Sequence, residues 1–138
     1  MVSVLSILKQ LFGSFVALLG GWFAGVVSTA IIGFTGIGGA PRDATVSGTL
    51  AIAVFMWIYL VPVWIVALIP LYFAVPRTSA LWRPYICVSL GAIGGLLCGA
   101  LFTRGNIDPS MATWYAVAAV VGAGTCLTGV LTRDWFKP

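Results

Sequence analysis

The sequence contains very few side chains that could carry acid–base, nucleophilic or metal-binding chemistry. Histidine and glutamate are absent. The three aspartates all lie outside the long apolar stretches of the chain: Asp43, Asp108 and Asp134. Without paired carboxylates or imidazole groups, the usual hydrolytic mechanisms and histidine-containing metal sites cannot be built. We therefore expect no enzymatic activity, and no metal ion or other cofactor.

Three cysteines, Cys87, Cys98 and Cys126, are the remaining candidates for a nucleophile. A reactive thiol needs a nearby base or positive charge, and each of these cysteines has only apolar or hydroxyl neighbours in sequence. Cys87 and Cys98 share a helix face but are about 16 Å apart along the helix, which is too far for a disulfide. We expect all three cysteines to be small packing residues.

A group of aromatic residues is the one feature that could form a binding site. Trp22, Trp57, Tyr59 and Trp64 lie well inside the apolar stretches, and Pro62 is expected to kink the helix that carries three of them. Buried indole and phenol groups need hydrogen-bond partners. We expect these rings to fill the groove beside the kink. In the alternative, they line an apolar cleft that is open to a lipid, a quinone or another apolar solute.

Small residues recur at four-residue intervals in the apolar stretches. The positions that we expect to mediate helix packing are Gly21, Gly25, Thr29, Gly33, Gly91, Gly95, Gly99 and Gly122. Residues at this spacing lie along one side of a helix and allow a second helix to approach closely. We call such a row of small residues along one helix a glycine ridge. The glycine ridges predict tight packing within a single bundle or, alternatively, a face for self-association.

The helices that must position these groups are marked by an absence of charge. Of the 138 residues, 61% are hydrophobic and only 7% are charged. Four long stretches contain no acidic or basic residue: 12–34, 48–74, 85–103 and 111–131. A helix needs about 20 apolar residues to cross a hydrocarbon layer of about 30 Å. The sequence therefore predicts an all-α integral membrane protein in which residues 1–138 form a single domain of four transmembrane helices.

The predicted architecture is an up-down-up-down bundle with a long second helix that is kinked at Pro62. Pro62 and Pro70 cannot donate backbone hydrogen bonds, so this helix is expected to be irregular within the membrane. Residues 1–11 either extend the first helix or form a short interfacial helix, and the sequence leaves both alternatives open.

The few basic residues predict how the helices are oriented. If the helices alternate in direction, five basic residues lie on one side of the membrane: Lys9, Arg77, Arg83, Arg133 and Lys137. The other side has only Arg42 and Arg104, each close to an aspartate in sequence. Cytoplasmic loops are enriched in basic residues, so we expect both termini in the cytoplasm and the protein in a bacterial inner membrane. Because the basic residues are scattered singly, we expect no nucleic-acid partner.

Three classes of function are consistent with these features. The sequence favours an accessory or scaffolding subunit of a membrane complex, whose glycine faces would contact other transmembrane helices in a homo- or hetero-oligomer. The first alternative is an oligomeric passive channel or facilitator for a small solute, with a pore lined by glycine backbones and by the hydroxyl groups of Ser28, Thr29, Ser89, Thr125 and Thr128. The second is a lipid- or quinone-binding membrane protein. Proton-coupled transport is disfavoured because no acidic or basic residue lies within a predicted span. Membrane lipids are the partners that all three classes share.

Overall fold

The computed structural model describes residues 4–36, 46–76, 78–105 and 111–133, and this part of the chain is helical. The elements in order are α1 (Val4–Thr35), α2 (Val46–Val63), the π-helical turn η2 (Trp64–Leu68), α3 (Ile69–Ala74), the short 3-10 helix η3 (Ala80–Trp82), α4 (Pro84–Phe102) and α5 (Ala112–Thr132). The segments that are long and apolar enough to cross a membrane are Val4–Thr35, Gly48–Ala74, Pro84–Phe102 and Ala112–Thr132. The predicted helical class and the four predicted apolar helices are thus confirmed. Six of the charged residues lie outside the described residues: Arg42, Asp43, Arg77, Asp108, Asp134 and Lys137.

The first helix is longer at its N-terminal end than the apolar stretch that predicts it. α1 has 32 residues, which corresponds to about 48 Å at 1.5 Å per residue. Residues 4–11 form its first turns, so the structure has an extension of the first helix rather than a separate interfacial helix. At the other end, Gly36 has a φ of 67° and its N–H donates to the Ile32 carbonyl at 2.9 Å. Glycine adopts this left-handed conformation without steric cost and thereby ends the helix.

The second apolar stretch forms a helix with an irregular middle. Pro62 lies inside α2, and the π-helical turn η2 begins two residues later. In this turn the Ile69 N–H donates to the Trp64 carbonyl, five residues back. The turn lies between Pro62 and Pro70, neither of which can donate a backbone hydrogen bond. Single π-helical turns are a recognised response to such interruptions of a helix, and the structure places this one after Pro62 rather than at it.

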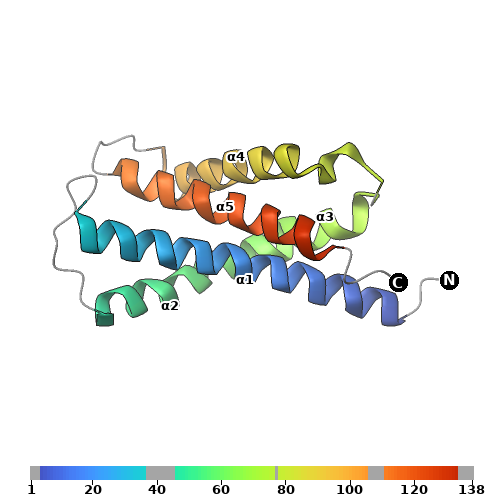
Figure 1. Cartoon of the computed structure of the whole chain (residues 1–138), viewed down its shortest axis with the longest axis horizontal. Helices are drawn as coiled ribbons and strands as arrows, with labels where there is room; N and C mark the ends of the chain where they lie inside the picture. Colours follow the sequence, from blue (N-terminus) through green and yellow to red (C-terminus); the bar gives the residue numbers. More distant parts are fainter. Residues whose placement is uncertain (1–3, 37–45, 77, 106–110, 134–138) are drawn as a thin grey trace.

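α5 lies between α1 and α4 and packs extensively against both, whereas α2 and α3 pack mainly on α1 (Figure 1). Contacting helices run in opposite directions: Gly21 lies opposite Thr125 and Gly25 opposite Val121, so that residue numbers rise along α1 as they fall along α5. The start of α1 and the end of α5 therefore lie at the same end of the bundle.

The contact between α4 and α5 brings backbone against backbone. A Cβ atom at Gly91 would overlap the Gly122 carbonyl oxygen, and a Cβ atom at Gly122 would overlap the Gly91 carbonyl oxygen. A Cβ atom at Gly95 would overlap the Ala118 carbonyl oxygen in the same way. At Gly99 the nearest atom belongs to an aromatic ring of α5, 3.2 Å from the Cβ position. The ridge on α4 is thus occupied by α5 of the same chain.

The ridge on α1 is occupied by α5 over part of its length. A Cβ atom at Gly21 would lie 2.7 Å from the Val121 carbonyl oxygen, and one at Gly25 would lie 2.5 Å from the Val121 side chain. Farther along, the Thr29 hydroxyl donates to the Gly25 carbonyl of its own helix at 2.9 Å. Gly33, near the end of α1, is half-buried. Gly21 and Gly25 therefore lie at an interface inside the bundle.

Candidate functional site

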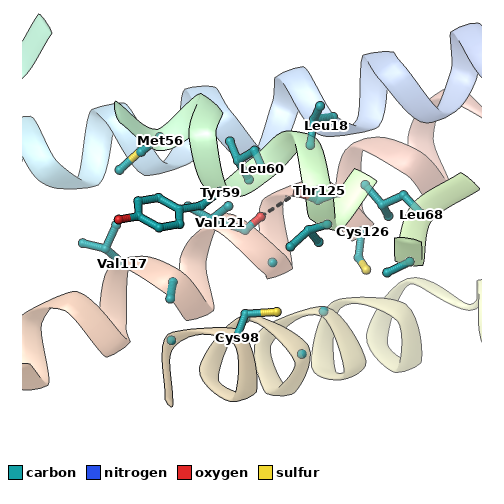
Figure 2. Close-up of a pocket in the computed structure, with 18 of the residues that line it drawn as sticks. Leu18, Met56, Tyr59, Leu60, Leu68, Cys98, Val117, Val121, Thr125 and Cys126 are labelled. Carbon is teal, nitrogen blue, oxygen red and sulfur yellow. Dashed lines mark hydrogen bonds between the residues drawn. The ribbon is translucent and has the colours of Figure 1, made fainter. Parts of the chain in front are cut away.

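A large apolar cavity lies between the second apolar helix and the pair formed by α4 and α5. Its volume is about 750 Å³, within the range of about 300–1,000 Å³ that small-molecule sites occupy. α2, η2 and α3 form one wall, α4 forms the other, and α5 forms the floor together with Leu18 of α1. Figure 2 shows Met56, Tyr59 and Leu60 extending from α2 toward this space.

The cavity lies where the backbones of α2 and α4 stay apart. In the described part of the chain their backbones make almost no contact, while α2 packs on α1 and α4 packs on α5. Gly94 is the glycine of α4 with open space beside it, because a Cβ atom there would meet nothing within 4 Å, and Gly94 lines the cavity. The cavity thus occupies the space between α2 and α4.

Aromatic contacts lie near both ends of the cavity. Near one end, the Tyr59 ring of α2 packs edge-on against Phe102 of α4, with ring centroids 4.5 Å apart. At the other end Trp82 of η3 lines the cavity and is only 6% exposed. These two ends are separated by the 19 residues of α4, or about 28 Å at 1.5 Å per residue. The cavity is therefore long enough for an extended hydrocarbon chain.

The lining of the cavity is apolar and uncharged. None of the described residues that line it is aspartate, lysine or arginine. The Thr125 hydroxyl is already used, since it donates to the Val121 carbonyl at 2.9 Å. The cysteines Cys87, Cys98 and Cys126 all line the cavity, and the Cys87 thiol lies 3.7 Å from the Cys126 carbonyl oxygen. An uncharged, largely apolar occupant matches this surface best.

The structure brings together only part of the aromatic site suggested by the sequence. Tyr59 lines the cavity. The residues that do not line it are Trp22, Trp57, Pro62 and Trp64. The rings of Trp22 and Trp57 lie 5.9 Å apart, and Phe15 of α1 packs 6.4 Å from Trp57 and 5.7 Å from Trp64. These tryptophans thus fill the contact between α1 and the second apolar helix, and none of them belongs to the cavity lining.

The indole groups in this contact have hydrogen-bond partners on the facing helix. The Trp22 N–H donates to the Ala53 carbonyl at 2.9 Å, and the Trp64 N–H donates to the Ser14 hydroxyl at 3.0 Å. Ser14 is 1% exposed and in turn donates to the carbonyl three residues before it. Satisfied indoles of this kind attach α2 and η2 to α1.

Sequence reasoning missed the α4 and α5 walls of the cavity. The clearest signal was Gly94, which stands beside the glycine ridge of α4 but one position out of its four-residue register. Glycines on the ridge face α5, whereas Gly94 faces no neighbouring helix. A glycine outside a packing ridge marks a helix face from which a side chain is missing, and the cavity lies there.

A comparison of the chain with protein-family models, curated proteins and solved structures gives no match. The features from which function can be inferred are the four apolar helices and the cavity. Of these, the cavity is the more specific, because function depends on sites rather than on a helical framework that many proteins share.

Proposed function

We propose that the chain is an integral membrane protein that binds a long-chain, uncharged amphiphile, of the neutral-lipid or quinone class, in the cavity between α2 and α4. The observation that carries this proposal is the cavity itself, with its volume of about 750 Å³ and its uncharged lining. In this proposal the occupant enters from the bilayer, between α2 and α4. An occupant from the membrane would reach the cavity without passing through water.

The outer surface of the helices supports the membrane part of the proposal. Large apolar side chains cover it, with Leu101 78% exposed, Val66 76% exposed and Val4 73% exposed. A water-soluble monomer rarely exposes apolar patches of this extent, whereas a bilayer solvates them. In our proposal the helices form an up-down-up-down bundle whose second span bends at η2. Both termini then face the cytoplasm, on the side with more basic residues, and the membrane is a bacterial inner membrane.

The binding part of the proposal requires more than apolar contact. Lipid tails are as apolar as the cavity wall, so transfer of an apolar chain from the bilayer into the cavity gains little from the hydrophobic effect. Selectivity for one occupant must come from the shape of the cavity and from a small number of polar contacts. The shape favours an elongated molecule, because the cavity extends along the length of α4.

The other two classes of function have weaker structural support. The subunit hypothesis depends on free glycine faces, but the glycines Gly21, Gly25, Gly91, Gly95 and Gly122 lie against α5 or α4 of the same chain. The channel hypothesis depends on five hydroxyl groups, and four of them already use their donor within the chain, while Thr128 is the fifth. Ser28, Thr29, Ser89 and Thr125 each donate to a carbonyl of their own helix at 2.8–2.9 Å. Our proposal assigns binding, and no reaction, to the cavity.

A titration with an apolar probe tests the proposal. The probe is a benzene ring with three methyl groups and a decyl chain, which has no polar atom and resembles a ring-and-tail amphiphile. We expect calorimetric titration of the protein in lipid nanodiscs to show saturable binding of one probe molecule per chain. Empty nanodiscs of the same lipid should take up the probe without saturation, and equal behaviour of the two samples would contradict the proposed function.

A further inference from the structure

Two of the three cysteines meet across the contact between α4 and α5. The Cys87 thiol donates to the Cys126 carbonyl oxygen at 3.7 Å, and the two thiols are hydrogen-bonded to each other. Cys126 also packs against the buried cluster to which Cys87 belongs. Both cysteines are free thiols. α4 and α5 thus bring together two thiols that are 39 positions apart in the sequence.

The register of the helix contact explains why these thiols meet. α4 and α5 are antiparallel, with Gly91 opposite Gly122 and, one turn farther along α4, Gly95 opposite Ala118. One turn in the other direction, toward the start of α4, the same register places position 87 opposite position 126. The pairing of the two cysteines therefore follows from the same close helix contact that the glycine ridge of α4 provides.

The separation of the two helices at this level suits a disulfide. A Cβ atom at Gly91 would lie 2.9 Å from the Cβ atom of Cys126 and 2.7 Å from its sulfur. Gly91 has no side chain, so the Cys126 side chain lies directly on the backbone of α4, one turn from Cys87. A disulfide joins Cβ atoms that are about 3.5–4.5 Å apart. The geometry is therefore compatible with a bond between the two sulfurs.

The surroundings of the pair determine which oxidants can reach it. Both cysteines line the apolar cavity, and Cys87 is only 6% exposed. A charged oxidant would lose its hydration in such surroundings, which is energetically costly. A quinone is uncharged, dissolves in the bilayer and accepts two electrons together with two protons. It therefore matches both the cavity and the number of electrons that two thiols release.

We infer that Cys87 and Cys126 are a redox-active pair, which a quinone bound in the cavity oxidises to a disulfide between α4 and α5. This inference rests on the proposed function and adds a reaction to binding. Two S–H bonds break and one S–S bond forms, while the two protons and two electrons convert the quinone carbonyls into the hydroxyls of a hydroquinone. Cys87 lies in the first turn of α4, and thiols at helix N-termini are among the more reactive ones.

Anaerobic reaction of the reduced protein with a quinone probe tests the inference. The probe is trimethyl-decylbenzoquinone, whose ring has no free position for a stable thiol adduct. With one equivalent per chain in lipid nanodiscs, we expect the free thiols to fall from three to one and the chain to lose the mass of two hydrogen atoms. One hydroquinone should appear per chain. The trimethyl-decylbenzene of the binding test should leave all thiols free.

Cys98→Ser is the matched control for the cysteine substitutions. Cys98 also lines the cavity, but the register of α4 and α5 places it opposite Tyr115 rather than opposite a thiol. This variant should be oxidised like the wild type and keep no free thiol. Cys87→Ser and Cys126→Ser should each keep both of their remaining thiols free and produce no hydroquinone.

Gly94→Leu tests whether the quinone reaches the thiols through the cavity. The added side chain would occupy part of the cavity without contacting α5 at the cysteine pair. With the quinone below saturation, we expect oxidation at least about tenfold slower than in the wild type, in line with weaker binding. Equal rates in the two proteins would overturn the inference, because the quinone would then reach the thiols by another path.

The outcomes separate the inference from the proposed function. If the benzene probe binds saturably and the quinone leaves all three thiols of the wild type free, the inference fails and the cavity stands as a binding site. Formation of a disulfide in Cys87→Ser or in Cys126→Ser would also overturn the inference, because Cys98 would then be a partner. If the benzene probe does not bind, the proposed function and the inference both fail.

Discussion

Replacement of Gly95 by alanine should lower the free energy of unfolding by about 1–3 kcal/mol, the usual cost of forcing extra atoms into a packed interior. The added Cβ atom would overlap the Ala118 carbonyl oxygen, and a backbone atom cannot move aside as a flexible side chain can. α4 and α5 would have to separate along their whole contact. The measurement is the unfolding of the purified protein by a denaturing detergent or by heat.

The matched control is the neighbouring glycine on the same helix. A Cβ atom at Gly94 meets nothing within 4 Å, and alanine is a better helix former than glycine by about 1 kcal/mol. Gly94→Ala should therefore be neutral or slightly stabilising. If Gly95→Ala and Gly94→Ala unfold alike, α4 and α5 do not pack through Gly95 as the structure has them.

Gly94→Leu should abolish ligand binding without unfolding the protein. The leucine side chain would project from α4 into the cavity and occupy the space opposite α2. We expect the affinity for the trimethyl-decylbenzene probe to fall at least about tenfold, equivalent to about 1.4 kcal/mol. The measurement is the nanodisc titration, together with a melting curve that shows the variant to be folded.

The control for this prediction adds the same bulk to a surface away from the cavity. Ala116 of α5 is exposed and is not among the lining residues, so Ala116→Leu should bind the probe like the wild type. Unchanged affinity in Gly94→Leu would place the probe elsewhere on the protein. A loss of affinity in both variants would indicate a general effect of added bulk rather than a filled cavity.

The four apolar helices could be predicted because lipid imposes a simple requirement. A span must hold about 20 residues without charge, and the four uncharged stretches show this directly. The start of α1 was harder to predict, because Lys9 interrupts the apolar pattern while the helix continues on both sides of it. The π-helical turn after Pro62 was also missed, since proline identifies which hydrogen bonds are lost but not how the next turn adjusts.

The site was less predictable, and α2 shows why. This helix is apolar on every side, so its sequence does not indicate which face packs on α1 and which remains free. The tryptophans were expected either to fill a groove or to line a cleft, and the structure places them in the contact with α1. The cavity depends on the missing side chain at Gly94, which the sequence contains, and on the distance between α2 and α4, which a single sequence does not state.

The glycine ridges also show that a sequence does not indicate which helices are neighbours. Their spacing predicted close helix packing, but it did not identify the neighbouring helix. In the structure α5 contacts both ridges, which requires a small residue of its own at Gly122 where it meets Gly91. A ridge that is occupied within the chain is not available to a partner protein, so knowing the neighbour changes the favoured function.

Native mass spectrometry of the protein taken directly from its own membrane gives the most direct test of ligand binding in the cavity. We expect each wild-type chain to retain one uncharged amphiphile of the neutral-lipid or quinone class, and the folded Gly94→Leu variant to retain none. A wild-type chain that emerges without a bound molecule, or with the same mixture of bulk phospholipids as the Gly94→Leu variant, would show that the cavity is not a binding site.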